Sequence, residues 1–147
     1  EVSLKMHDVK EIEVDSDYYY INTGSPHFII EKADIKKVDV KTEGAAIRYN
    51  ERFKAEGTNV NFVNYKEQEL DIRTYERGVE DETLSCGTGV TAAALSWADK
   101  NNVETGKIKV NTVGGALQVA FKMADKGFKD IWLIGPAEQV FKGEVEL

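Results

Sequence analysis

Short runs of β-branched and aromatic residues recur along most of the chain, and polar or turn-forming residues separate them. Runs of this kind are typical of β-strands. They predict about eight or nine strands, at Val2–Met6, Tyr18–Asn22, Phe28–Glu31, Asn59–Asn64, Leu70–Tyr75, Lys107–Asn111, Ala116–Met123, Ile131–Ile134 and Val140–Val145. Two glycine-containing pairs, Gly114–Gly115 and Gly135–Pro136, predict turns between strands.

Two other stretches place apolar residues at helical spacing. The first covers about Val38–Phe53, although Gly44 in its middle disfavours a helix. The second begins near Gly87 and ends at Asp99–Asn101, and its first two-thirds is apolar on nearly every side. A helix without a polar face is normally buried all round. We therefore expect an α+β domain whose sheet wraps round this central helix.

The composition is that of one water-soluble globular domain. Of the 147 residues, 41% are apolar and 31% are charged, which suits a core of useful size. The net charge of -7 offers no basic face for nucleic acid. No apolar stretch reaches the roughly 18 residues that span a bilayer, and the first residues do not resemble a secretion signal. These features predict a cytoplasmic protein that binds neither nucleic acid nor membrane.

The single cysteine, Cys86, lies immediately before the predicted central helix. Because unpaired N–H groups and the positive end of the helix dipole favour an anion there, the thiol is expected to ionise readily and to act as a base. Gly87 and Gly89 flank Thr88, which would let the backbone N–H groups approach a carboxylate. The alternative is structural, with Cys86 as a small buried residue and the glycines as a tight turn.

Charged residues precede this thiol in the sequence. Glu80, Asp81 and Glu82 would oppose a thiolate at close range, so we expect their side chains to point into solvent. Glu76 and Arg77 follow a predicted strand. They could hold the ammonium and the carboxylate of a zwitterion, or they could form an ordinary surface ion pair.

Histidine and metal chemistry gives weaker signals. His27 follows another predicted strand and titrates near neutral pH, yet a single histidine is more often structural than catalytic. One cysteine and two widely separated histidines match no metal site, and no glycine-rich phosphate loop follows a strand. We expect neither a metal nor a cofactor.

Several motifs occur in the order found in one known family. They are Gly24–His27, Asn59–Phe62, Glu76–Gly78, Glu82–Thr83, Cys86–Gly89 with an Ala-rich helix after it, and Gly135–Glu138. Over nearly its whole length the chain resembles the second half of diaminopimelate epimerases. The resemblance implies a mixed, mostly antiparallel sheet of about eight strands round the central helix, plus a second helix. It also implies that residues 1–147 are the C-terminal domain of a two-domain enzyme whose N-terminal domain is absent from this sequence.

In that family, the resemblance implies, two cysteines face each other across a cleft and no cofactor takes part. Inversion at carbon needs a base on one face and an acid on the other, so one thiolate takes the α-proton while the opposite thiol delivers one. Cys86 would be the second-half thiol. The Gly87 and Thr88 amides would hold the α-carboxylate of the substrate, and His27 and Glu76 would tune how readily the thiols ionise.

The remaining implied roles concern substrate binding. Asn59, Glu76 and Arg77 would bind the amino and carboxylate groups of the substrate, including those at its distal end. Ser25 stands where the family usually has an asparagine, and its shorter side chain would reach the substrate through water. The loop after Arg77 is one residue longer than the usual pattern, with Asp81 as the extra residue.

Together these features predict an isomerase that interconverts LL- and meso-diaminopimelate in lysine and peptidoglycan precursor synthesis, and whose full-length form is compatible with a homodimer. Because the reaction needs two thiols and the chain has one, the isolated chain is expected to be inactive. Two alternatives are a proline or hydroxyproline racemase, which shares the Cys-Gly-Thr-Gly run, and a binding module in which Cys86 is only packed. Asn59 and Glu76–Arg77 favour a substrate with a second charged end, which proline lacks.

Overall fold

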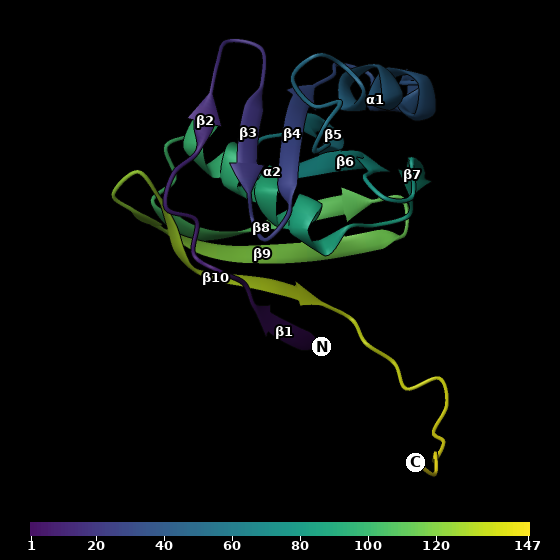
Figure 1. The fold of residues 1–147 in the computed structure, drawn as a ribbon. Coiled ribbons are helices and arrows are strands. Elements are labelled where there is room, and N and C mark those ends of the chain that lie inside the picture. The colour runs from purple at the N-terminus through teal and green to yellow at the C-terminus, as the bar shows by residue number, and fades with distance from the viewer.

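The computed structural model describes residues 1–147, which form one ten-stranded sheet and two α-helices (Figure 1). The strands are β1 (Val2–Lys5), β2 (Glu13–Val14), β3 (Tyr19–Asn22), β4 (Pro26–Glu31), β5 (Asn59–Tyr65), β6 (Glu69–Glu76), β7 (Asp81–Thr83), β8 (Thr105–Thr112), β9 (Gly115–Ala124) and β10 (Gly127–Gly135). The helices are α1 (Val40–Arg48), α2 (Gly87–Lys100) and a short 3-10 helix, η1 (Ile35–Lys37). The sheet runs in the order β1-β10-β9-β8-β6-β5-β4-β3-β2, with β7 paired to β6. Neither α-helix is long and apolar enough to cross a membrane.

Two neighbouring strand pairs are parallel, and each is joined by a connection that contains a helix. β4 and β5 are joined through η1 and α1, and β6 and β8 are joined through β7 and α2. Parallel neighbours need such a crossover because the chain must return to the same end of the sheet before the second strand can run in the same direction. All other pairs are antiparallel. The predicted mixed, mostly antiparallel sheet is therefore confirmed.

Helix α2 lies inside the curl of the sheet (Figure 1). It contacts β3 to β6 and β8 to β10. Every residue from Gly89 to Ala98 is buried, and this segment packs with the inner faces of the strands into a core of 19 buried residues. The apolar surface of α2 thus drives the sheet to close round it, and the prediction of a central buried helix is confirmed.

Strand β5 is buried on both faces, because α2 covers one face and α1 covers the other. Val60 and Phe62 pack in the cluster that includes α1, whereas Val63 packs in the core round α2. Asn59 and Asn61 alternate with Val60 and Phe62, so their side chains are on the α2 face. Two buried amides that need hydrogen-bond partners therefore lie on the inner side of the sheet.

Helix α1 is shorter than the predicted Val38–Phe53. It begins after Asp39, whose carboxylate accepts a hydrogen bond from the Thr42 N–H at 3.2 Å. It ends after nine residues, and Asn50 then turns the chain, since its Oδ1 accepts a hydrogen bond from the Phe53 N–H at 2.9 Å. The polar side chains at both ends decide these bounds, because each offers the backbone an alternative partner.

Gly44 lies within α1, at the point where the helix touches β6. A Cβ at this position would lie 2.5 Å from the Tyr75 Cβ and 2.6 Å from its Cγ. The low helix propensity of glycine is offset here by close packing against a fully buried tyrosine. The glycine is therefore part of the helix–sheet contact rather than an interruption of the helix.

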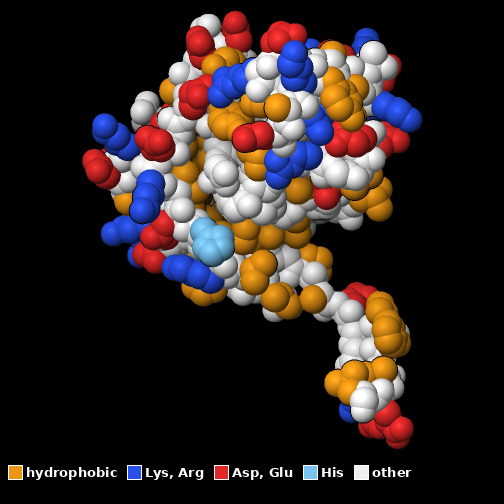
Figure 2. Space-filling view, in the orientation of Figure 1, with side chains coloured by type: hydrophobic (Ala, Val, Ile, Leu, Met, Phe, Trp, Pro, Cys, Tyr) orange, Lys and Arg blue, Asp and Glu red, His pale blue; other side chains and the backbone are white.

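The predicted strand Val140–Val145 is wrong. No residue after Gly135 belongs to a helix or strand, and the tail carries exposed apolar side chains away from the body of the domain (Figures 1 and 2). β10 already pairs with β9 on one side and with β1 on the other, so it offers no free edge to a further strand. The predicted turn at Gly135–Pro136 is likewise absent, whereas the one near Gly114–Gly115 joins β8 to β9.

The sequence pattern misses two short strands, β2 and β7. They have two and three residues, too few for a recognisable alternation. β7 matters for the arrangement described below, because it places Thr83 opposite Thr74 of β6 and thereby fixes the chain that leads to Cys86.

Candidate active site

Four separate stretches of the chain meet where α2 begins. β4 and β5 start side by side, with His27 opposite Asn59, and β6, which is antiparallel to β5, ends beside them. The loop before β4 is tied to the helix by a 2.7 Å hydrogen bond from Thr23 Oγ1 to the carbonyl oxygen of Thr88. The register of the sheet thus brings together side chains that are as much as 61 positions apart in the chain.

Cys86 occupies the N-cap position of α2. Its backbone is extended, its thiol is half-buried, and no acidic residue lies in the first turn of the helix. The N–H groups of Gly87, Thr88 and Gly89 have no acceptor within the chain, as is usual for the first turn of a helix. Such N–H groups and the helix dipole attract an anion. The thiol therefore lies next to three N–H groups that are free to donate to an anion.

His27 is fully buried and lies between the sheet and the start of α2. Its Nε2 is 2.8 Å from Thr88 Oγ1, and its Nδ1 is 2.8 Å from Asn61 Nδ2. Thr88 Oγ1 is in turn 3.5 Å from Cys86 Sγ. Burial, with the positive charge of Arg77 as a second cause, lowers the pKa of His27 to about 3. The imidazole is therefore neutral at neutral pH and is linked to the thiol through one hydroxyl.

Because Gly89 has no side chain, His27 and Asn61 can pack directly against its backbone. A Cβ on Gly89 would lie 2.8 Å from Asn61 Oδ1 and 3.1 Å from His27 Cε1. Gly89 is not among the residues with positive φ, so close packing and not backbone freedom requires a glycine here. Gly87 instead faces the sheet, where a Cβ would lie 3.0 Å from Leu133 Cδ2. Both glycines thus have a packing role that the sequence interpretation did not include.

Asn59 is buried and uses its amide within the chain. Its Nδ2 donates to Ser25 Oγ at 2.9 Å and to the Pro26 carbonyl at 3.0 Å, and its Oδ1 accepts from the Arg77 N–H at 2.8 Å. Asn59 therefore fixes the positions of Ser25 and Arg77 relative to each other. Direct contacts of Asn59 and Ser25 with a substrate stay predictions.

The two charges at the end of β6 have no counterion within the chain. Glu76 is partly exposed, and its carboxylate forms neither a hydrogen bond nor an ion pair. The guanidinium of Arg77 donates to the Glu56 carbonyl oxygen at 2.9 Å and meets no carboxylate. Glu76 and Arg77 do not form the surface ion pair that is the alternative interpretation of these residues. Both charges are open to a charged ligand.

The three carboxylates between Arg77 and Cys86 do not simply point into solvent, contrary to the prediction. Each is partly buried and is held by a cation of the same chain: Glu80 by Arg48 at 3.3 Å, Asp81 by Lys41 at 3.5 Å, and Glu82 by Arg73 at 2.7 Å. The Glu82–Arg73 contact is bidentate, with both carboxylate oxygens bound. Because these charges are compensated, they oppose a thiolate at Cys86 less than free carboxylates would.

Two polar residues near the thiol are not singled out by the sequence interpretation. Thr74 Oγ1 donates to Asn61 Oδ1 at 2.9 Å, and Asn61 Nδ2 reaches the ring of His27. The available signal is the pair Asn59 and Asn61 in an otherwise apolar strand, since residues two apart share one face of a sheet. Polar residues on a buried face need partners from neighbouring strands.

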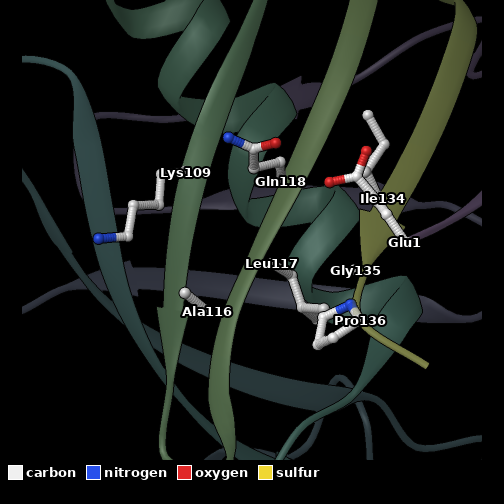
Figure 3. Close-up of a pocket in the computed structure, with 8 residues that line it drawn as sticks. All are labelled: Glu1, Lys109, Ala116, Leu117, Gln118, Ile134, Gly135 and Pro136. Carbon is white, nitrogen blue, oxygen red and sulfur yellow. The ribbon is translucent and has the colours of Figure 1, made fainter. Parts of the chain in front are cut away.

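A separate cavity of about 340 Å³ lies on the outer face of β8, β9 and β10, where Lys109 and Gln118 alternate with the core residues Ile108 and Val119 (Figure 3). Its lining consists of Glu1, Lys109, Ala116, Leu117, Gln118, Ile134, Gly135 and Pro136. None of these is a predicted site residue. No group of three or more His, Cys, Asp or Glu side chains is arranged to hold a metal ion.

A mixed sheet that curls round one buried helix defines the class of this protein as an α+β domain with a central helix. A solved structure described as a predicted epimerase from Pseudomonas aeruginosa has this fold, with a TM-score of 0.56 and 11% identity over 85% of this chain and 41% of that one. The chain belongs to the diaminopimelate epimerase family, because the sequence model of that family matches residues 19–140.

Two curated relatives illustrate the likeness. The diaminopimelate epimerase of Flavobacterium psychrophilum is 44% identical over 96% of this chain, and that of Aquifex aeolicus is 44% identical over 86% of it. The aligned regions cover 56% and 45% of those proteins. The chain thus spans about half the length of the curated relatives it matches.

Proposed function

We propose that this chain is the second domain of a cofactor-independent epimerase that interconverts LL- and meso-diaminopimelate, with Cys86 as one of two catalytic thiols. The observation that carries the proposal is the position of Cys86, half-buried at the start of α2 and next to three N–H groups without acceptors. Membership of the diaminopimelate epimerase family supports the choice of substrate.

The chemistry requires a base beside a site for a carboxylate. As the Cys86 thiolate takes the α-proton, the C–H bond breaks, an S–H bond forms, and the electron pair spreads onto the substrate carboxylate. The Gly87 and Thr88 N–H groups would stabilise that growing negative charge, because helix N-termini present fixed donors that need no reorganisation. Inversion is completed when an acid on the opposite face delivers a proton to the same carbon.

The second thiol has to come from another domain, since this chain has one cysteine. That the chain spans about half the length of its relatives agrees with a first domain that closes over Cys86. The isolated chain would then remove or supply a proton on one face only and would not epimerise. In the cell the enzyme would act in the cytoplasm, on the route to lysine and peptidoglycan precursors.

A substrate with two amino-acid ends fits the charges at the end of β6. Diaminopimelate carries an ammonium and a carboxylate at each end, and one pair remains free when the reacting end sits at α2. The uncompensated guanidinium of Arg77 would hold the distal carboxylate, and Glu76 would hold an ammonium. Asn59 and Ser25 would support these contacts by fixing the backbone of Arg77. Proline has no second charged end for these groups.

The test is α-proton exchange on LL-diaminopimelate in deuterated water, catalysed by the complete polypeptide that contains these residues. We expect Cys86→Ala to lower exchange and inversion at least about 100-fold, because it removes an acid/base group. Ser85→Ala is the matched control, since Ser85 is the exposed neighbour of the thiol and should leave the rate unchanged. The isolated 147-residue chain is measured in parallel.

Three results would contradict the proposal in different ways. Equal activity of the Cys86→Ala and unaltered polypeptides would exclude the thiol as a base. Inversion by the isolated chain above the level of its Cys86→Ala variant would exclude the need for a second thiol. Turnover of proline or hydroxyproline, without turnover of LL-diaminopimelate, would assign the domain to a different racemase.

A further inference from the structure

A continuous line of four hydrogen bonds leads from the sheet to the sulfur of Cys86. Thr74 Oγ1 contacts Asn61 Oδ1 at 2.9 Å, and Asn61 Nδ2 contacts His27 Nδ1 at 2.8 Å. His27 Nε2 contacts Thr88 Oγ1 at 2.8 Å, and Thr88 Oγ1 contacts Cys86 Sγ at 3.5 Å. Asn61 and His27 are fully buried and Thr74 is nearly so, so water does not compete for the contacts among these three residues, whereas Thr88 and Cys86 are half-buried.

One direction of donation along this line agrees with the groups at both of its ends. At the sheet, the hydroxyl of Thr74 donates to the amide oxygen of Asn61, which leaves the amide nitrogen to donate to His27 Nδ1. A neutral imidazole that accepts at Nδ1 carries its proton on Nε2 and donates there to Thr88. At the other end, a thiolate can only accept, so the Thr88 hydroxyl donates to it. With a thiolate at Cys86, both ends therefore agree on the same direction of donation.

The reverse direction is chemically distinct. If the amide of Asn61 were turned over, its oxygen would accept a proton from Nδ1, and Nε2 would accept from the Thr88 hydroxyl. The Thr88 hydroxyl would then have no hydrogen left for the sulfur. The tautomer of His27 therefore shows whether the Thr88 hydroxyl can donate to Cys86. With the ring proton on Nε2 it can, and with the ring proton on Nδ1 it cannot.

Packing fixes the positions of Asn61 and His27 in this line. The missing side chain of Gly89 leaves room for Asn61 Oδ1 and His27 Cε1, which a Cβ would approach to 2.8 Å and 3.1 Å. The neutral state of His27 agrees with this picture, because a charged ring would have to donate to the Asn61 amide.

We propose that Thr74 and Asn61 are positioning residues that hold neutral His27 in the Nε2–H tautomer, so that the Thr88 hydroxyl donates to Cys86 and favours its thiolate. Neither Thr74 nor Asn61 touches the thiol, and both act through His27. The importance of this line for catalysis rests on the proposed function, whereas the tautomer and the state of the thiol can be measured on the chain itself.

The first measurement is long-range proton–nitrogen NMR on chain labelled with nitrogen-15 in histidine. His7→Gln leaves His27 as the only histidine, so its two ring nitrogens can be assigned. We expect Nε2 to carry the proton and Nδ1 to be unprotonated. Asn61→Leu should abolish this preference, while Asn64→Leu, on the same strand but bonded to the Lys32 and Ala33 carbonyls, should keep it.

The second measurement is the rate of Cys86 alkylation by iodoacetamide as a function of pH. Thr88→Val should move the midpoint of this profile up by about one pH unit, because a hydrogen bond to a charged group is lost. Thr88→Ser should restore the midpoint. Thr91→Val is the matched control, since Thr91 lies one turn further along α2 and bonds only the Gly87 carbonyl.

The charged groups on the segment that leads to Cys86 are the same in all of these variants: Glu76, Arg77 and the paired Glu80, Asp81 and Glu82. A shift seen in Thr88→Val and not in Thr91→Val therefore reports the hydroxyl. A proton on Nδ1 in the unaltered ring, or equal midpoints for Thr88→Val and the unaltered chain, would overturn the proposal. If these results are as expected but the complete polypeptide does not exchange LL-diaminopimelate, the proposed function fails and the line of hydrogen bonds stands.

Discussion

Replacing His27 by glutamine is expected to change how the stability of the domain depends on pH. The ring is fully buried, and its pKa in the folded chain is about 3, compared with 6.5 for an ordinary histidine. Between these two values the unfolded chain binds a proton at His27 and the folded chain does not. The contribution of His27 to stability is therefore complete above pH 6.5 and falls as the pH drops towards 3.

The size of this pH effect follows from the uptake of one proton by His27 on unfolding. Within this window each pH unit changes the free energy of unfolding by about 1.4 kcal/mol. Between about pH 7.5 and about pH 4.5, His27 alone should remove about 2.7 kcal/mol of stability. Glutamine does not titrate, so the variant lacks this loss. Near pH 7.5 the variant should be about 1–3 kcal/mol less stable, because Asn61 and Thr88 lose a buried partner, and by about pH 4.5 this deficit should have vanished or reversed.

Urea unfolding at about pH 7.5 and about pH 4.5 measures both free energies, with the fluorescence of Trp97 in the core as the signal. The difference between the unaltered chain and His27→Gln cancels the titration of the carboxylates that both share. His7→Gln is the matched control, because His7 is exposed and its removal should leave the pH dependence unchanged. A constant difference between the chain and His27→Gln at both pH values would refute the reasoning, since it would mean that His27 takes up its proton without unfolding.

Three further predictions concern the fold. Gly44→Ala should lower the free energy of unfolding by about 1–3 kcal/mol despite the better helix propensity of alanine, because its Cβ would overlap Tyr75, and thermal or urea unfolding would show this. Arg73→Met should cost about 1–3 kcal/mol in urea unfolding, since it removes the bidentate contact with Glu82 and the bonds to the carbonyls of the segment before α1. Phe141→Ser should change the stability by less than about 0.5 kcal/mol, because the side chain is exposed, and a larger loss would show that the tail packs on the domain.

Much of the architecture could be predicted from local pattern. Eight of the nine predicted strands correspond to strands of the sheet, and the exception is Val140–Val145. That segment has the composition of a strand, yet β1 and β9 already occupy both sides of β10. A run of β-branched residues forms a strand only if a neighbouring strand has a side that is not yet hydrogen-bonded. The composition of the run does not show whether such a strand is available.

The predicted site residues were found in part by pattern and in part by resemblance. The thiol at the start of an apolar helix and the lone His27 can be noticed in the sequence. The charges of Glu80 and Asp81 can be noticed too, but their pairing with Arg48 and Lys41 depends on a helix that lies more than 30 positions away in the chain. Long-range ion pairs of this kind have no signature in local sequence. Glu82 pairs with Arg73 only because β7, which the sequence pattern misses, lies beside β6.

The burial of α2 and the position of Cys86 at its start can both be predicted from the residue pattern, because burial follows from an apolar surface on every side and the N-cap follows from where that surface starts. The alignment of Thr74, Asn61 and His27 with that thiol depends instead on the folded sheet. Their contacts depend on the register of β4, β5 and β6, and register is set by how both faces of β5 pack against α1 and α2. Local propensity acts over a few residues, whereas a hydrogen bond between residues 34 or 61 positions apart exists only once the whole sheet has closed round its helix.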